Sequence, residues 1–262
     1  MRKAEPACFY FAEPLSPRYS QPVSIDMNLQ EHYDEMRATA VSKFARGEAE
    51  PDFLIDSPYD TRRGITLLAR PPAHITAIIE RIMADFRQSE PDQYYQPAGD
   101  IHLTIMSIIT CYPGFALHVI DPSDYVSAVE AIVRGIRPFS VEYSGLTAFP
   151  GGVIVQGFPQ SSGLQLLRKE IRHHFRNSSL QQSIDQRYSI QTAHATVIRF
   201  RNPVLNPARL LKMLEKYRQY FIGSFEVSEV ALVYNDWYQR AANTVLLGKF
   251  TLGTGHQPAW NC

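Results

Sequence analysis

The sequence of 262 residues predicts an α+β fold of two lobes, in which two antiparallel sheets are flanked by helices around a central cleft. Strand-like segments alternate with amphipathic helices along the chain. Two strand-like segments 92 positions apart share one pattern, and each follows a strand and a helix. We interpret this as a weak internal duplication, a strand-helix-strand unit used twice.

The composition is that of a globular protein, with 45% hydrophobic and 20% charged residues. The formal net charge is zero, which argues against a broad basic surface for long duplex nucleic acid. A local anion pocket remains compatible with this balance. We therefore expect a nucleotide or an RNA end as the partner.

Three cysteines, Cys8, Cys111 and Cys262, share no metal-ligand spacing. We expect reduced thiols in a cytoplasmic protein. The apolar stretch 7–12 is too short for a signal peptide, and no apolar run approaches the length of a membrane span, so no membrane partner is expected.

The N-terminal part is predicted to be an arm, 1–50, ahead of a bilobal domain, 51–262. Residues 1–26 are punctuated by prolines, and an amphipathic helix of about 20 residues then ends at Gly47. The arm either packs on the main body or meets a partner, and we favour packing.

The bilobal domain is expected to begin with a strand at 65–69, a helix at 72–88 and a strand that carries His102. A helix opens at Asp121-Pro122, because aspartate caps a helix and proline suits its first turn. Two strands, 139–149 and 153–158, join through a turn at 150–152. A helix at 162–177, a strand with His194, a helix from Asn206-Pro207 and strands near 222–234 and 243–252 complete the series.

The two repeated segments are 101–105, Ile-His-Leu-Thr-Ile, and 193–197, Ala-His-Ala-Thr-Val. Alternate residues of a strand share a face, so His102 and Thr104 point one way, as do His194 and Thr196. A third triplet begins at His74, but it lies in a predicted helix, where residues two apart do not face each other. A half-buried histidine satisfied by backbone groups is the alternative for each copy, and the repetition favours a shared site.

The chain at this point resembles the two-histidine phosphoesterase superfamily, which contains RNA 2′-5′ ligase-like proteins and cyclic phosphodiesterases. The motif segments 102–105 and 194–197 match its H-x-T/S-x pattern, with each x apolar. The strand pair and helix over 138–175 also resemble the family, and the resemblance covers roughly 60–252. Ala193 departs from the usual proline before the second histidine.

The resemblance implies a catalytic quartet of His102, Thr104, His194 and Thr196, with Arg199 as a substrate-binding residue. Strict alternation places Arg199 on the opposite face from His194, so it reaches the site only if the strand ends or bulges there. A surface arginine is the alternative.

The quartet suits metal-independent hydrolysis of a 2′,3′-cyclic phosphate or a 2′-5′ linked nucleotide. Histidine titrates near neutral pH and can serve as general acid or general base, and the threonine hydroxyls can stabilise charge on the phosphoryl oxygens. We expect no cofactor and no metal; a metal site at His173-His174 is disfavoured because adjacent helical residues diverge. The reverse reaction would ligate RNA ends.

Two other functions stay open, a nucleotide- or RNA-end-binding module with little turnover and a mutarotase-type sugar epimerase. Aromatic residues could stack on a base, or belong to the core or the rim of the site. They are Tyr94, Tyr95, Tyr112, Trp237 and Tyr238.

Overall fold

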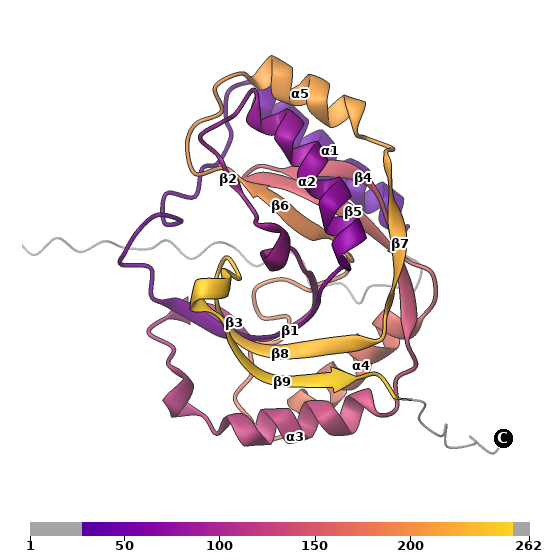
Figure 1. Cartoon of the computed structure of the whole chain (residues 1–262). Coiled ribbons are helices and arrows are strands. Elements are labelled where there is room, and N and C mark those ends of the chain that lie inside the picture. The colour runs from indigo at the N-terminus through magenta and orange to yellow at the C-terminus, as the bar shows by residue number, and fades with distance from the viewer. Residues whose placement is uncertain (1–27, 254–262) are drawn as a thin grey trace, which may run out of the picture.

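The computed structural model of the chain describes residues 28–253, which form two lobes, each built on one antiparallel sheet (Figure 1). The sheet of the first lobe, below in Figure 1, has the strand order β3 (Leu103–Pro113), β1 (Arg62–Ala69), β8 (Glu229–Asp236) and β9 (Val245–Thr251). The sheet of the second lobe has the order β2 (Tyr94–Tyr95), β6 (Ala195–Arg199), β5 (Gly152–Pro159), β4 (Phe139–Phe149) and β7 (Phe221–Val227).

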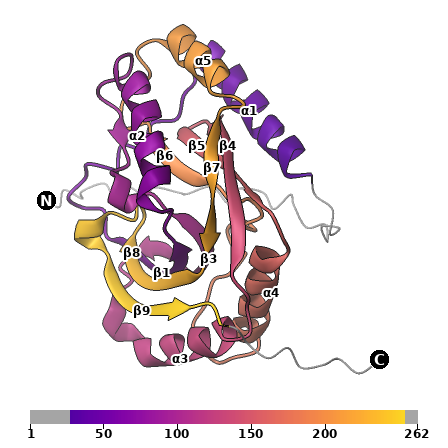
Figure 2. The same cartoon turned by 45° about the vertical axis from the view of Figure 1, so that its right-hand side comes forward.

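The helices are shared out between the lobes, as the two views of Figures 1 and 2 show. Helices α1 (Leu29–Ala45), α2 (Ala73–Arg87) and α5 (Pro207–Lys216) lie with the second sheet. Helices α3 (Pro122–Val133) and α4 (Gly163–Arg176) lie with the first. Short 3₁₀ turns are η1 (Ala98–Asp100), η2 (Leu117–Val119) and η3 (Ala241–Asn243). The expected bilobal α+β fold is confirmed, and because α2 follows a strand of one lobe but packs on the other, the lobes are interleaved.

Three details of the expected strands were wrong. The single strand expected at 222–234 is two strands, β7 and β8, which belong to different sheets and are separated by Ser228. Both histidines lie one residue before their strands, since β3 begins at Leu103 and β6 at Ala195. The two-residue strand β2 was not foreseen, because two residues are too few to show any periodicity.

Helix α1 packs on the second sheet through Tyr33, which is fully buried. Its hydroxyl donates to the carbonyl of Gly157 and accepts from the amide of the same residue, both at 3.1 Å. One turn further along the same side of the helix, Arg37 pairs with Glu215 of α5 at 2.7 Å. The preference for packing over a free arm holds for this helix, whereas the domain boundary near residue 50 stays a prediction and residues 1–27 lie outside the described part.

None of the helices in the described range 28–253 is long and apolar enough to cross a membrane.

Replacing Tyr33 with phenylalanine should lower the free energy of unfolding by roughly 1–3 kcal/mol, because it leaves a buried peptide N–H and C=O of Gly157 without a partner. Urea denaturation of the wild type and Tyr33→Phe measures the difference. Tyr59→Phe is the control, since the Tyr59 side chain is largely exposed. Equal stability of Tyr33→Phe and the wild type would contradict this account of how α1 is held.

Candidate active site

The four motif residues and Arg199 line one cavity of about 110 Å³. His102 and Thr104 reach it from the first sheet, and His194, Thr196 and Arg199 from the second. Residues nearly a hundred positions apart therefore share one site between the two sheets. Their catalytic role remains a prediction.

Arg199 reaches the cavity because β6 bulges. Ile198 pairs with Val153 and Thr196 with Ile154, so Val197 is an extra residue on β6. A bulge of this kind shifts the alternation of side chains by one position. Arg199 consequently lies on the same side of β6 as Thr196. On the sequence alone, Arg199 needed such a bulge, or the end of the strand, to reach the site.

The guanidinium of Arg199 is a cation without a counter-ion. It makes no ion pair or hydrogen bond with any residue of the described range 28–253, and it lies 5.6 Å from the centre of the Tyr238 ring. Burial lowers its pKa. An unpaired, half-buried cation facing a cavity favours an anionic ligand there.

His102 is fixed in one orientation by the backbone. Its Nδ1 lies 2.7 Å from the carbonyl oxygen of Asp100. A carbonyl only accepts hydrogen bonds, so Nδ1 carries the proton. In the neutral ring Nε2 is then a free acceptor.

His194 has a different partner. Its Nδ1 lies 2.6 Å from the hydroxyl of Thr192, which is buried. A hydroxyl can donate or accept, so this contact supports the neutral ring as well as the protonated ring. The two histidines are matched in sequence but not in hydrogen bonding.

Both imidazoles are neutral in the free protein at neutral pH. Burial lowers the pKa of His102 to about 4, and the nearby Arg70 and Arg199 add to the effect. Burial also lowers the pKa of His194 to about 4, helped by the charges of Arg168 and Arg199. A bound anion would offset these charges and raise both values.

Arg168 of α4 joins the two motif segments from behind the site. The side chain is buried and donates to four backbone carbonyls, at distances between 2.8 and 3.3 Å. Two belong to the first motif, Thr104 and Ile105, and two precede the second histidine, Gln191 and Thr192. It has no ion pair within the described part of the chain, and burial lowers its pKa to about 9. The sequence analysis missed this residue.

Bulges also shape the wall formed by β3. Along the pairing of β1 with β3, the residues Ile105 and Ile108 are passed over, because Leu68, Leu67, Thr66 and Ile65 pair with Thr104, Met106, Ser107 and Ile109. Thr104, Ser107 and Thr110 thus all line the cavity at a spacing of three. The sequence does show these hydroxyl residues three positions apart within an apolar run. Because a regular strand has a period of two, this spacing does not by itself indicate a shared face.

Six further residues outside the two motif segments line the cavity. They are Thr66, Cys111, Tyr188, Asn235, Trp237 and Gln239. Burial raises the pKa of Cys111 to about 12, so its thiol stays protonated.

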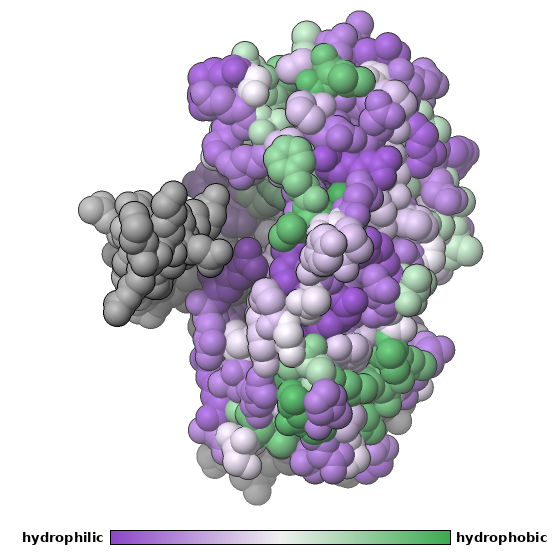
Figure 3. Space-filling view, turned by 90° about the vertical axis from the view of Figure 1, so that its left-hand side faces the viewer, coloured by the Kyte–Doolittle hydropathy of each residue, from purple (hydrophilic) through white to green (hydrophobic). Residues whose placement is uncertain are grey.

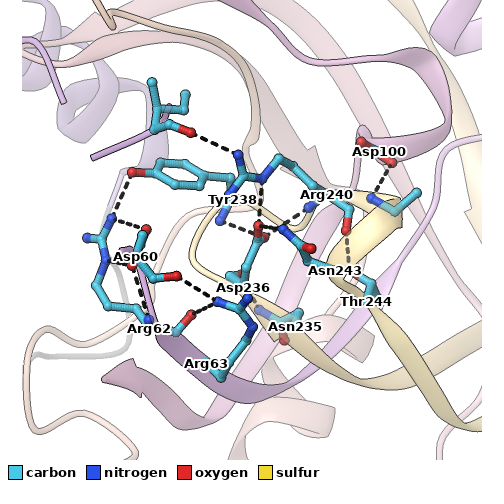
Figure 4. A network of polar contacts seen from close by, with 12 residues as sticks. Asp60, Arg62, Arg63, Asp100, Asn235, Asp236, Tyr238, Arg240, Asn243 and Thr244 are labelled. Atoms are coloured by element: carbon cyan, nitrogen blue, oxygen red, sulfur yellow. Dashed lines mark hydrogen bonds and ion pairs between the residues drawn. The ribbon is translucent and has the colours of Figure 1, made fainter. Parts of the chain in front are cut away.

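A buried carboxylate holds the turn that carries Trp237 and Gln239 (Figure 4). Asp236 accepts from the amides of Tyr238 and Arg240, both at 3.0 Å, and from Arg240 Nε at 2.6 Å. Gln239 has a φ of 61°, which non-glycine residues rarely adopt. The Asp236 contacts on both sides stabilise this conformation.

Other expected candidates lie elsewhere. Of the aromatic residues proposed for stacking, only Trp237 lines the cavity. In the described range 28–253, no group of three His, Cys, Asp or Glu side chains is placed to hold a metal ion. A larger hollow of about 860 Å³ lies between β7, β8 and β9 and contains neither motif histidine. Figure 3 shows one face of the molecule, which is mostly hydrophilic with separate smaller hydrophobic areas.

Solved structures share this fold. TT0787 of Thermus thermophilus is 16% identical, with a TM-score of 0.54 over 73% of this chain and 99% of that one. ATU0111 of Agrobacterium tumefaciens str. C58, a conserved protein of unknown function, is 12% identical, with a TM-score of 0.50 over 79% and 98%. E. coli LigT complexed with 3′-AMP is 16% identical, with a TM-score of 0.48 over 73% and 99%. No family model and no curated protein matches the chain.

The likeness to TT0787 and ATU0111 confirms the fold that the sequence resemblance implied. The comparison supports the arrangement of the two lobes and no more.

Replacing Arg168 with methionine should raise the pKa of His194 from about 4, because a neighbouring positive charge is removed. It should also lower the free energy of unfolding by roughly 3 kcal/mol, since four buried carbonyls lose their donor. NMR titration of the histidine rings and urea denaturation measure the two effects. Arg168→Lys keeps the positive charge but loses the several N–H donors of the guanidinium. It should therefore lower the stability of the protein while leaving the pKa of His194 near its original value. An unchanged His194 pKa in Arg168→Met would contradict the proximity of the charge.

Proposed function

We propose that the protein is a metal-independent phosphodiesterase of the two-histidine type, which hydrolyses a 2′,3′-cyclic phosphate or a 2′-5′ linked nucleotide. The convergence of His102, His194 and the unpaired Arg199 on one cavity supports the proposal most strongly. Two groups able to transfer protons and one able to neutralise an anion are what hydrolysis of a phosphodiester requires.

The hydrogen bonds of the two rings suggest how the proton transfers divide. His102, with Nδ1 held by the Asp100 carbonyl, presents Nε2 as the base that removes a proton from water. The water oxygen attacks phosphorus, and the bond from phosphorus to one ribose oxygen breaks. His194 in its protonated form gives its proton to that oxygen, with Nδ1 donating to the Thr192 hydroxyl. The product is a phosphomonoester, and proton exchange with solvent restores both rings.

The remaining residues stabilise the charge that develops on the phosphoryl oxygens. The hydroxyls of Thr104 and Thr196 line the cavity and can donate to the non-bridging oxygens, while Arg199 balances their charge. The same geometry run backwards joins a 5′-hydroxyl to a cyclic phosphate, which is ligation. Hydrolysis should dominate because water is abundant.

The size of the cavity bears on the substrate. A volume of about 110 Å³ is too small to enclose a whole nucleotide, so the base must lie outside it. A nucleotide or the end of an RNA strand can enter in this way. A continuous duplex cannot place an internal phosphate between the two sheets as readily.

The second candidate is a binding module with little turnover. It is favoured by the neutral state of both imidazoles, since a general acid must first gain a proton. No observation on the described residues favours a sugar epimerase.

Replacing His102 or His194 with glutamine should lower the kcat for a 2′,3′-cyclic nucleotide by roughly 10²- to 10⁴-fold, because each ring transfers a proton in the transition state. A panel of cyclic nucleotides and 2′-5′ linked dinucleotides, assayed with EDTA present and with the phosphate position of the product determined, measures the effect. His74→Gln is the control, since His74 opens the third H-x-T triplet but is exposed on α2. Retained turnover in either motif variant would exclude the mechanism, and tight binding without turnover in the wild type would indicate the binding module.

Anion binding should take up a proton, because an anion between the rings raises a pKa that is about 4 in the free protein. Sulfate is a suitable probe, since its charge is constant near neutral pH. Its affinity should rise as the pH falls from 8 toward 5, with a slope of up to about tenfold per pH unit for one proton. Calorimetry in buffers of different ionisation enthalpy counts the protons. His194→Gln should flatten the dependence, and a flat dependence in the wild type would show that neither ring gains a proton.

A further inference from the structure

Three hydroxyl side chains outside the quartet line the same cavity without a hydrogen-bond partner. They are Thr66, Ser107 and Thr110, none of whose hydroxyls bonds to a residue in the described range 28–253. Two further lining side chains, Asn235 and Gln239, each have a buried amide oxygen without a hydrogen-bond partner in the same range. Buried polar groups in proteins normally have partners. The two amide oxygens lack a donor and the three hydroxyls beside them are free to donate or accept, so this part of the cavity suits a ligand group that does both.

The wall on which they stand carries no charge. Its other members are Cys111, whose thiol stays protonated, and Asn235, whose side-chain amide donates to the carbonyl of Asp236 at 2.7 Å. No lysine, arginine, aspartate or glutamate belongs to this wall; the one arginine of the cavity, Arg199, stands on β6. Phosphate binding by hydroxyls is normally supported by a cation, whereas hydroxyls on a wall without charge suit another neutral hydroxyl or a base edge.

The wall runs away from the histidines along β3. A strand rises by about 3.3 Å per residue, so Ser107 and Thr110 lie up to roughly 10 and 20 Å along the strand from Thr104. A phosphate held by the quartet cannot contact both. What reaches them must be a second unit of the substrate, connected to the reacting nucleotide.

We propose that this hydroxyl wall of Thr66, Ser107 and Thr110 binds the ribose of a flanking nucleotide through its 2′-hydroxyl, so that the substrate is an RNA end of at least two nucleotides rather than a free mononucleotide. The inference rests on the proposed phosphodiesterase function and adds the substrate class. A 2′-hydroxyl both donates and accepts, and it is the group by which proteins distinguish RNA from DNA.

The test compares two dinucleotides that end in the same 2′,3′-cyclic phosphate and differ only in the sugar of the preceding nucleotide, ribose or deoxyribose. The wild type should show a kcat/KM roughly 3- to 10-fold higher for the ribose form, the value of a neutral hydrogen bond. The double variant Ser107→Ala, Thr110→Val should bring the ratio of the two kcat/KM values close to one. The control Ser224→Ala, Thr251→Val changes the same residue types at exposed strand positions outside the cavity, and should keep the ratio.

Equal kcat/KM values for the two dinucleotides in the wild type would overturn the inference, as would an unchanged ratio in the double variant. Failure of the proposed function is seen separately, because then no cyclic phosphate, mononucleotide included, is hydrolysed. In that case calorimetry of the two dinucleotides decides the inference alone: tighter binding of the ribose form, lost in the double variant, supports it, and equal affinities refute it.

Discussion

The site depends on one buried arginine. Arg168 places a guanidinium between the first motif strand and the segment that leads into the second histidine, and it satisfies carbonyls of both. Its ligands are backbone oxygens, with no carboxylate paired to it in the described part of the chain, so the desolvation of the charge is offset only by those hydrogen bonds. Loss of either segment would leave the charge unsatisfied. The two motif segments are therefore held at one separation by an interaction that neither motif contains.

Periodicity in the sequence predicted the strands and helices and the face that each motif histidine shares with its threonine, whereas the catalytic role of the quartet is implied by the family resemblance and stays a prediction. Alternation in the two H-x-T segments put each histidine and its threonine on one face, and the structure agrees. The role of Arg168 is not visible in the sequence, because α4 carries many charged residues and most of them are expected to face solvent. Its neighbour Leu167 belongs to the apolar stripe that packs in the core. Nothing in its neighbours along the chain shows that it meets carbonyls of Thr104 and Thr192, which are contacts between distant segments.

Bulges account for what alternation could not show. Regular strands would have turned Ser107 and Arg199 away from Thr104 and Thr196, yet extra residues in β3 and β6 return them to the cavity. Bulges depend on pairing with neighbouring strands, here β1 and β5, so they cannot be inferred from one strand's own sequence. The bulge in β6 thus brings the unpaired cation Arg199 to the cavity, and the bulges in β3 bring the hydroxyl of Ser107 there.

The two halves of the site are similar, but the proposed reaction needs them to differ. Each half supplies a histidine and a threonine, and burial depresses both histidine pKa values alike. The difference enters through the partner of Nδ1, a carbonyl for His102 and a hydroxyl for His194. The carbonyl fixes one tautomer of His102, whereas the hydroxyl can switch between donating to His194 and accepting from it as the ring loses or gains a proton. If the site transfers protons as proposed, the histidine with the adaptable partner is better suited to change charge during turnover. A single hydrogen bond at Nδ1 then distinguishes the general acid from the general base in two otherwise similar halves.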